Sequence, residues 1–386
     1  MFDKVRQTFL LKRGIKYVTI NKTGKKEVKF VKILHTADLH LASSMKTDLS
    51  GEQATARKNE LISNFKRMAD YAETNGISAF IIAGDLFDTG RVPKKTVRYI
   101  TDCMAAHPDI TFFYLCGNHD RSDLSLLSDD LPENIVTFTK GWKYIKKDNV
   151  VFAGRELLTE GMYDDLSLDS GDFNIVILHG QEIFSGSGGD LISIPWLAGK
   201  NIDYLALGHL HYYHTYELDG RGTVCYPGCP EGRGFDECGE KGFAVIDTEA
   251  EKEDRVTFVP FASRTLHEIH VSADTDDIAL SDFEHKIIEA VKDIPDRDMV
   301  KVVLEGRISA DSEIDANFLE NMLEERFYFS RFRDRTELYI DPDEYSGDVS
   351  LKGELIRYLA DLDIDPELKR DAALTAIAAL KGEDIV

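Results

Sequence analysis

The chain has 386 residues, 43% of them hydrophobic, and a formal net charge of −23. This length suffices for two or three domains with buried cores, and the negative charge argues against a simple polyanion-binding protein. No segment approaches the roughly 20 apolar residues of a membrane-spanning helix, and no export signal is recognisable. Five cysteines fit a reducing compartment better than a disulfide framework, so we expect a cytoplasmic protein without membrane attachment.

The N-terminus is strongly basic. Residues 1–32 contain ten Lys or Arg against Asp3 and Glu27, which gives a local charge of +8. We interpret residues 1–30 as a basic extension exposed to solvent, in which Asn21–Lys26 can form the turn of a small hairpin. The alternative interpretation is an arm that contacts nucleic acid.

Residues 31–262 are expected to form one domain built around buried strands. Short, continuously apolar and β-branched runs are typical of strands covered on both faces. Five such runs follow one another: Val31–His35, Ala79–Ala83, Thr111–Cys116, Asn174–Leu178 and Tyr204–Leu207. Apolar residues at helical spacing predict helices over Glu52–Asn75 and Val92–His107, which join the first three strands as βαβ crossovers do.

The rest of this domain has a weaker pattern. Within residues 121–170 we predict a strand at Val150–Gly154 and a loop over the acidic stretch Asp164–Asp172. Gly-rich turns then separate three predicted antiparallel strands, at Tyr212–Glu217, Thr223–Tyr226 and Gly242–Asp247. The sheet is therefore expected to begin as βαβ units and to end with antiparallel neighbours.

The C-terminal third is predicted to contain a small α+β capping domain over residues 263–342. Its expected elements alternate between strand and helix: Thr265–Val271, Ser281–Val291, Met299–Ile308, Asn317–Glu325 and Glu337–Ile340. Residues 343–386 are expected to supply a linker and two short amphipathic helices, Val349–Asp361 and Pro366–Leu380. Such helices would dock on the body of the protein or on another protein.

Each of the five buried runs ends in a turn that carries ligand-type side chains. In chain order the turns are Asp38-Leu39-His40, Gly84-Asp85-Leu86-Phe87-Asp88, Gly117-Asn118-His119-Asp120, His179-Gly180 and Gly208-His209-Leu210-His211. Any one of them has an ordinary structural explanation, such as turn chemistry or a hydrogen-bonded histidine at a strand end. Five in succession instead indicate one shared site, because open α/β folds place their sites at the carboxyl ends of strands.

The side chains in these turns are suited to binding a pair of divalent metal ions. Seven ligands are predicted: Asp38, His40, Asp85, Asn118, His179, His209 and His211. The two oxygens of Asp85 can bridge the ions, and seven ligands leave open positions for a hydroxide and for substrate oxygens. Carboxylate, amide and imidazole together suit Mn²⁺, Fe or Zn²⁺ better than Ca²⁺ or Mg²⁺. The expected chemistry is in-line attack on phosphorus, which predicts a metal-dependent hydrolase.

A separate zinc site is the less favoured interpretation of the cysteines. Cys225, Cys229 and Cys238 cluster in a Gly-rich loop. A zinc site there would need a fourth ligand and a familiar ligand spacing, and neither is visible. Free thiols are therefore expected.

Taken together, the motifs of residues 31–262 resemble the calcineurin-like metallophosphoesterase superfamily. Its signature is Asp-x-His, Gly-Asp, Gly-Asn-His-Asp/Glu, His and Gly-His-x-His, in this order. The resemblance implies an α/β fold, a β-sandwich flanked by helices. It also implies that one ion is held by Asp38, His40, Asp85 and His211, and the other by Asp85, Asn118, His179 and His209. His119 would face the scissile phosphate, Asp120 would orient His119, and Asp88 is expected to be an outer or turn residue.

Within that superfamily the chain is similar to the DNA-repair exonuclease branch, of the bacterial SbcD and meiotic-recombination nuclease type. The similarity lies in His35–Leu41, Gly84–Asp88 and Tyr226–Pro230, and in the later Lys241-Gly242. It implies Mn²⁺-dependent 3′-to-5′ exonuclease cleavage of DNA with some endonuclease activity. It also implies a homodimer and an SMC-like coiled-coil ATPase partner of the SbcC type, docked on C-terminal helices. Cys229 departs from the branch, in which a serine is usual.

Two other functions are compatible with the sequence. The first is a metallophosphoesterase that acts on nucleotides, phosphoproteins or another small phosphodiester. The second is a scaffold that mainly binds an ATPase. A complete set of seven ligands argues against the scaffold, because binding alone does not require it.

Overall fold

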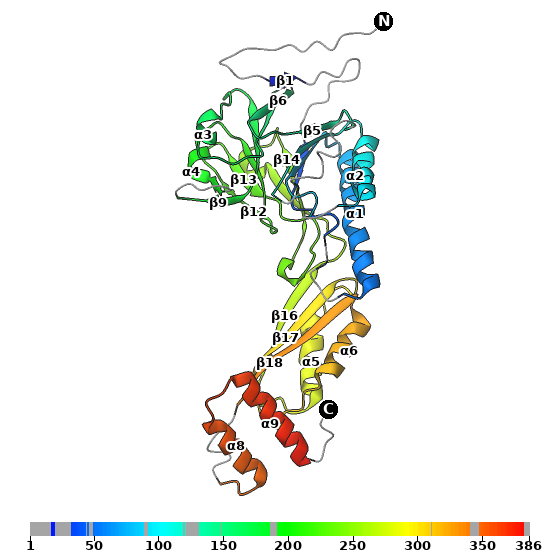
Figure 1. The fold of residues 1–386 in the computed structure, drawn as a ribbon, viewed down its shortest axis with the longest axis vertical. Helices are drawn as coiled ribbons and strands as arrows, with labels where there is room; N and C mark the ends of the chain where they lie inside the picture. The colour runs from blue at the N-terminus through cyan, green and yellow to red at the C-terminus, as the bar shows by residue number, and fades with distance from the viewer. Residues whose placement is uncertain are drawn as a thin grey trace. The chain divides into compact units, whose positions relative to one another are not determined.

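The computed structural model describes residues 17–19, 32–43, 45, 49–88, 92–118, 120, 131–147, 149–185, 191–309, 311–339 and 347–381. The chain divides into two compact units, Met1–Thr265 and Leu266–Val386, whose elements are labelled in Figure 1. Within the described ranges, the helices are too short or too polar to cross a membrane. The hairpin predicted at Asn21–Lys26 lies outside these ranges. Of the basic extension, Tyr17–Thr19 is described and forms strand β1.

Two large sheets form the body of the first unit. The six-stranded sheet contains, in spatial order, β15 (Val256–Pro260), β14 (Gly242–Asp247), β2 (Lys32–Thr36), β3 (Ala79–Ala83), β4 (Thr111–Leu115) and β5 (Ile135–Thr137). The seven-stranded sheet contains β1, β6 (Lys143–Lys147), β7 (Val150–Gly154), β8 (Phe173–His179), β11 (Tyr204–Gly208), β13 (Thr223–Tyr226) and β12 (His214–Glu217). Neighbours from β2 to β5 are parallel, as are β7, β8, β11 and β13.

The sheets pack face to face around a common core. Phe113 of β4 stacks on Phe152 of β7, with ring centroids 3.9 Å apart. Across the same interface, His35 Nδ1 of β2 lies 2.8 Å from the Tyr204 hydroxyl of β11. Strands covered on both faces must be apolar at every position, which is why the five runs show no alternation. The predicted β-sandwich is confirmed.

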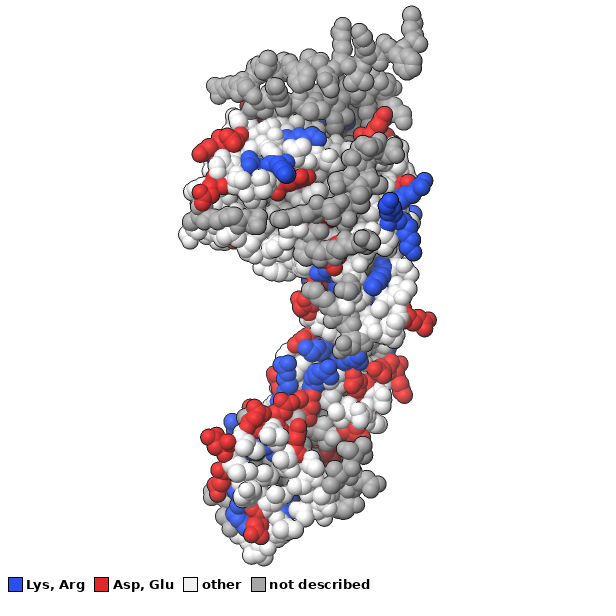
Figure 2. Space-filling model, viewed as in Figure 1, with Lys and Arg blue, Asp and Glu red and all other residues white. Residues whose placement is uncertain are grey.

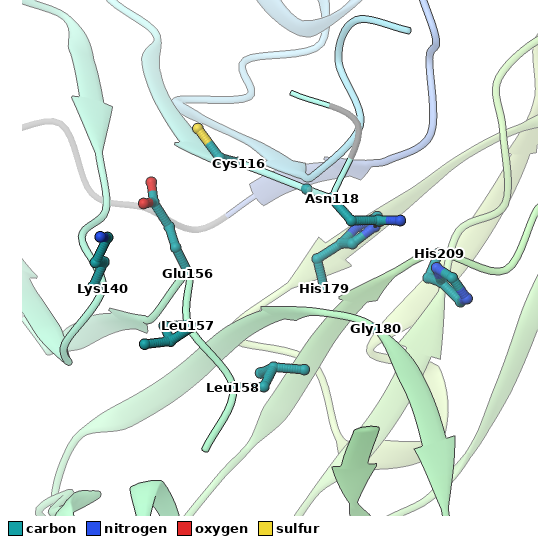
Figure 3. A pocket seen from close by; sticks show the side chains of 10 residues that line it. Cys116, Asn118, Lys140, Glu156, Leu157, Leu158, His179, Gly180 and His209 are labelled. Atoms are coloured by element: carbon teal, nitrogen blue, oxygen red, sulfur yellow. The ribbon is translucent and has the colours of Figure 1, made fainter. Parts of the chain in front are cut away.

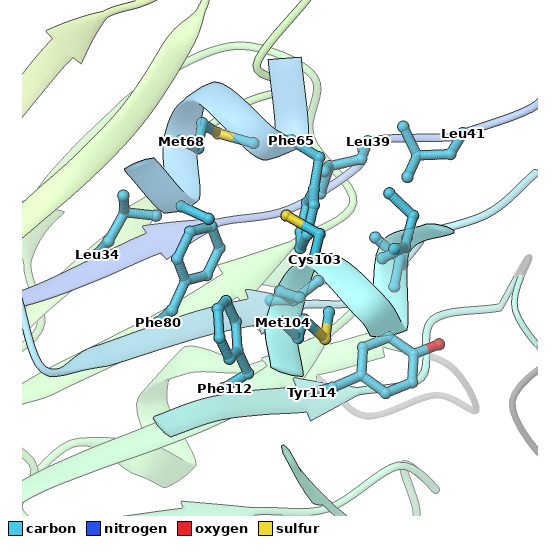
Figure 4. Close-up of a cluster of buried hydrophobic side chains, with 14 of the residues drawn as sticks. Leu34, Leu39, Leu41, Phe65, Met68, Phe80, Cys103, Met104, Phe112 and Tyr114 are labelled. Carbon is cyan, nitrogen blue, oxygen red and sulfur yellow. The ribbon is translucent and has the colours of Figure 1, made fainter. Parts of the chain in front are cut away.

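Helices cover the outer faces of the sandwich (Figure 1). Helices α1 (Gly51–Thr74) and α2 (Lys94–Ala106) pack on the six-stranded sheet, where Phe65 of α1 meets Phe80 and Phe112. Figure 4 shows this cluster. The short helices α3 (Met162–Asp165) and α4 (Ile194–Leu197) cover the other sheet, beside the ribbon of β9 (Gln181–Ile183) and β10 (Leu191–Ser193). Ser50 caps α1, and Gly76 follows the helix with a positive φ of 67°.

Three details of the sequence interpretation are wrong. The residue pattern predicts one continuous sheet, whereas the strands form two sheets, as the resemblance implied. A continuously apolar run indicates that a strand is buried but does not identify the neighbouring strand. The antiparallel pair β12 and β13 closes the seven-stranded sheet, whereas β14 returns to pair with β2. The acidic stretch predicted as loop begins inside α3.

The second unit contains a parallel three-stranded sheet in the order β16 (Leu266–Ala273), β17 (Met299–Ile308) and β18 (Phe329–Leu338). Helices α5 (Leu280–Val291) and α6 (Ala316–Arg326) bury Phe283, Ile287 and Leu319 against one face. Helices α8 (Leu351–Asp361) and α9 (Pro366–Lys381) follow. The last strand begins eight residues earlier than the predicted Glu337–Ile340. Arginines at alternate positions interrupt its apolar residues, so the strand has no continuous apolar run.

Candidate metal centre

The turns that follow β2, β3, β8 and β11 meet, although these strands belong to two different sheets. Backbone bonds join the first two turns, from Asp38 N to Gly84 O at 3.1 Å and from His40 N to Asp85 O at 2.9 Å. The amide of His209 donates to the Asp38 carboxylate at 2.9 Å, which ties the last turn to the first. The sandwich therefore brings the predicted ligands together by main-chain contacts.

Two overlapping groups of side chains could each hold an ion. The ligand atoms of Asp38, His40 and His211 lie within 4.8 Å of one another, and so do those of Asp38, Asp85 and His179. Asp85 faces both groups, because its Oδ2 is 3.7 Å from His40 Nε2 and 3.3 Å from His179 Nε2. Ligands about 2.1 Å from a shared ion lie roughly 3.0–3.5 Å apart, so these spacings fit a metal site.

The remaining predicted ligands lie beside these groups. Asn118 Oδ1 is 2.9 Å from His179 Nε2, and His40 Nε2 is 3.3 Å from His211 Nε2. The His209 ring stands perpendicular to that of His179, with centroids 5.6 Å apart. All seven predicted ligands thus come together, and their oxygen and imidazole donors fit divalent transition ions.

The ligand turns have strained backbones. Among the described residues, Asp38, His40, Asp85 and His209 are four of the six non-glycine residues with positive φ, at 54°, 45°, 51° and 115°. This region disfavours residues with a Cβ and persists only where surrounding contacts impose it, most often at functional sites. These strained turns carry donors from separate strands into one cluster.

Glycines in the motifs permit close approach. A Cβ on Gly117 would overlap the carboxylate of Asp85, and a Cβ on Gly84 would overlap the imidazole of His179. Packing therefore explains why a glycine precedes Asp85 and Asn118. Each glycine makes room for a ligand carried by a different turn.

Burial sets the electrostatics of the cluster. It raises the pKa of Asp38 to about 6, against the opposing effect of His179 and His211. Burial also lowers the pKa of His40 to about 3, helped by Arg233. Burial works against a charge on His179 too, but its hydrogen bond to Asp85 and the charges of Asp38 and Asp85 raise its pKa to about 9. Divalent ions compete with these protons, because they bind deprotonated ligands.

Oxygen atoms lie near the far ring nitrogens of three of the histidines. Nδ1 of His179 lies 2.9 Å from Ala83 O, within hydrogen-bond distance, and Nδ1 of His40 lies 3.6 Å from Asp88 Oδ1, within ion-pair distance. Asp88 thus lies next to a candidate ligand and outside the candidate ligand groups. Nδ1 of His211 lies 2.8 Å from Glu237 Oε1, and Glu237 was not found from the sequence. Glu237 sits in a Gly-rich loop, 26 residues from His211, without a distinguishing spacing.

Asp120 braces the turns. Its carboxylate accepts hydrogen bonds from the amides of Leu86, Phe87 and Gly117, at 3.1, 2.7 and 3.1 Å. Burial raises its pKa to about 6, although these bonds favour the charged form. The predicted contact of Asp120 with His119 lies outside the described residues, because His119 is not described.

A pocket of about 490 Å³ opens beside the cluster (Figure 3). Asn118, His179 and His209 form its metal-centre side, and Lys140 and Glu156 stand across from them. Leu157 and Leu158 add an apolar wall. Cys116 also lines this pocket. In the described part of the chain, the groups that could hold a metal contain no cysteine, and none of the five thiols takes part in a disulfide bond.

Residues 31–213 match the calcineurin-like phosphoesterase family, so the resemblance seen in the motifs is confirmed for this domain. The uncharacterized metallophosphoesterase YhaO of Bacillus subtilis (strain 168) is 26% identical over 237 residues, 55% of this chain and 56% of YhaO. The D component of the nuclease SbcCD of Escherichia coli (strain K12) is 24% identical over 270 residues, 56% of this chain and 65% of that component.

The DNA double-strand break repair protein Mre11 of Archaeoglobus fulgidus is 22% identical over 347 residues, 78% of this chain and 74% of Mre11. The chain thus spans less than two thirds of YhaO and of the SbcCD component. Among solved structures, TT1561 of Thermus thermophilus aligns with 57% of this chain and 95% of its own, at a TM-score of 0.39 and 13% identity.

Proposed function

Because residues 31–213 form a calcineurin-like phosphoesterase domain, we propose that this metallophosphoesterase is a two-metal DNA phosphodiesterase. It would act as a 3′-to-5′ exonuclease, with some endonuclease activity, in DNA repair or recombination. The carrying observation is the convergence of carboxylate, amide and imidazole donors around Asp85, next to an open pocket. The names of two relatives, a nuclease component and a double-strand break repair protein, support DNA as the substrate.

Each ligand has a proposed place. Asp38, His40, Asp85 and His211 would hold one ion, and Asp85, Asn118, His179 and His209 the other. Bound divalent ions would supply a hydroxide near neutral pH and neutralise charge on the phosphate, and Mn²⁺ is the favoured ion, with Fe or Zn²⁺ as alternatives. The ligand turns fix the donors in advance, so positioning requires no rearrangement when substrate binds.

His119 is proposed to act on the phosphate rather than on an ion. It would stabilise charge on the reacting phosphate or protonate the leaving oxygen, with Asp120 as its partner. His119→Ala should lower turnover about 10²–10³-fold while the chain retains its two Mn²⁺ ions, because one charge-stabilising group is lost. The turnover rate and the bound Mn²⁺ of the His119→Ala variant are measured together. Parallel losses of activity and metal would contradict this role.

Charge restricts how DNA can bind. The chain is strongly acidic overall, and on the face drawn in Figure 2 basic side chains lie among acidic ones in both units. Phosphate contacts must therefore come from the ions and from local groups such as Lys140 in the pocket. We further propose a homodimer and an SMC-like coiled-coil ATPase partner of the SbcC type. The large apolar side chains of Leu351 and Tyr358 on α8, 65% and 64% exposed, would receive the ATPase.

A nuclease assay tests the proposal. A linear duplex labelled at the 3′ or the 5′ end is incubated with the chain and Mn²⁺, and a nitrophenyl phosphodiester is measured in parallel. Stepwise loss from 3′ ends is expected, with Asp85→Ala as the control for contaminating nucleases. Turnover of the small ester without any DNA cleavage would favour the second candidate, a phosphodiesterase of nucleotides or other small esters.

A further inference from the structure

We propose that Glu237 is a positioning residue of the metal centre, which holds His211 so that its Nε2 faces a metal ion. This inference rests on the proposed two-metal function. The carboxylate accepts a hydrogen bond from Nδ1 of His211, with Oε1 and Nδ1 2.8 Å apart. A neutral imidazole carries one ring proton, so placing it on Nδ1 leaves the Nε2 lone pair available as a ligand.

The geometry of the ring supports this assignment. Nε2 of His211 points toward the cluster, where it lies 3.3 Å from Nε2 of His40. Glu237 is 3% exposed and ends the 3₁₀ turn Phe235–Glu237, so its carboxylate is fixed and shielded from water. His179 is held in the same manner by the carbonyl of Ala83. Glu237 thus does for His211 what a main-chain oxygen does for His179.

Arg233 fixes the carboxylate in turn. Its guanidinium Nη2 lies 2.6 Å from Glu237 Oε1, and its main-chain amide donates to Oε2 at 2.8 Å. The same Nη2 is 3.3 Å from His211 Nδ1, so an uncompensated guanidinium would stand next to a site for cations. Glu237 therefore has two effects that favour a metal ion. It orients the histidine and it neutralises the buried arginine.

The loop that carries this pair is anchored on both sides. Glu231 receives hydrogen bonds from Arg57 of α1 at 3.0 Å and from the Ser263 amide at 2.7 Å. Lys241 donates to the main-chain oxygen of His211 at 2.8 Å. The loop between Glu231 and Lys241 is thereby held against both α1 and the histidine turn, which gives Glu237 a rigid support.

A Mn²⁺ titration of the full chain tests the proposal, with calorimetry giving the affinity of each site. In Glu237→Gln, one of two ions should bind about 10–100-fold more weakly, the usual effect of losing an outer partner of a ligand, and the other should be unaffected. The matched control is Glu240→Gln, an exposed residue of the same loop, which should titrate like the wild type. The melting temperature of each metal-free variant reports separately on folding.

A double variant separates orientation from charge. Glu237→Gln leaves Arg233 buried without its anion but keeps an amide oxygen that can accept the Nδ1 proton of His211, whereas Arg233→Gln combined with Glu237→Leu removes both charges and the acceptor. The double variant should still bind one ion at least about tenfold more weakly than the wild type. If the single variant does not fold, the double variant alone tests the proposal. Wild-type affinity in either variant would overturn the role of Glu237. A wild-type chain that binds fewer than two Mn²⁺ ions would overturn the proposed function, and this role with it.

Discussion

Both units contain parallel strands joined by crossover helices, β2 to β4 in the first unit and β16 to β18 in the second. The units differ in the residues that follow these strands. In the first unit, the acids at the strand ends, Asp38 and Asp85, face imidazoles and each other. In the second, Asp277 comes after β16 and pairs with Lys286, while it also accepts the amide of Asp274 at 2.7 Å.

Backbone strain separates the units in the same way. The described non-glycine residues with positive φ all belong to the first unit, and four of the six are proposed ligands. A parallel sheet edge thus offers a location, but a site also needs carboxylates and imidazoles that face one another and a backbone that aims them. Matched changes in the two units test this difference.

The largest difference in activity between matched variants of the two units is expected when the acidic residue after a strand is replaced. Asp85→Ala removes the carboxylate that lies within 3.7 Å of His40 and 3.3 Å of His179, so both ions should be lost. Hydrolysis of a nitrophenyl phosphodiester should fall by at least about 10³-fold, the upper end of what a single charge-stabilising group contributes. Asp277→Asn should instead lower the melting temperature and leave the rate unchanged. A similar rate loss in both variants would remove the distinction.

Matched glycine changes should have the next largest effect. Gly117→Ala places a methyl group on the Asp85 carboxylate and should lower the rate about 10²-fold, since a displacement near 1 Å is enough for such a loss. Gly306→Ala in β17 meets Ala273 O at a φ of 110°, so it should destabilise the second unit only. Rate and thermal unfolding of both variants check this. Normal activity in Gly117→Ala would mean that the surrounding residues shift to relieve the overlap without displacing the Asp85 carboxylate.

The sequence predicts that the candidate ligands meet at one place, but it does not predict how the strands are divided between two sheets. Asp38, Asp85 and His179 lie at ends of buried strands, where an apolar run stops and a turn begins, and that transition is visible in one dimension. The distribution of strands over two sheets is not visible, because Ile81 and Ile177 are equally buried whichever sheet holds them. Sheet membership depends on contacts between strands far apart in the chain.

Glu237 and β18 show two other limits. The hydrogen bond of Glu237 to His211 depends on the path of a Gly-rich loop, and no periodic pattern encodes that path. In β18, Arg331, Arg333 and Arg335 alternate with Phe332 and Asp334, so one face of the strand is charged. A search for continuous apolar runs finds strands buried on both faces and overlooks one that is covered on a single face.

Metal binding should stabilise one unit and not the other. Mn²⁺ at 100 times its dissociation constant should add about 2.7 kcal/mol per ion, or roughly 5.4 kcal/mol for two ions, to the unfolding free energy of the first unit, because the unfolded chain lacks the assembled ligands. Calorimetric scans with Mn²⁺ and with a chelator measure this. The transition of the second unit should stay in place, and Asp85→Ala should abolish the gain. A shift of both transitions would show that the units unfold together.

The smallest difference should come from carboxylates that accept hydrogen bonds from backbone amides. Asp120→Asn leaves one acceptor oxygen for the amides of Leu86, Phe87 and Gly117, and its NH₂ group faces a donor. The buried mismatch should cost about 1–3 kcal/mol of stability and lower the Mn²⁺ affinity, because the turns on either side of Asp85 are no longer braced.

Asp282 is the matched residue of the second unit, where it accepts the amides of Ile278 and Ala279 at 3.1 and 2.9 Å. Its position is exposed, so water can replace the lost acceptor, and Asp282→Asn should cost at most about 1 kcal/mol with unchanged metal binding. Denaturant unfolding and Mn²⁺ titration of both variants give the comparison. If Asp120→Asn lowered stability but left Mn²⁺ affinity intact, the bracing of the turns would be structural only.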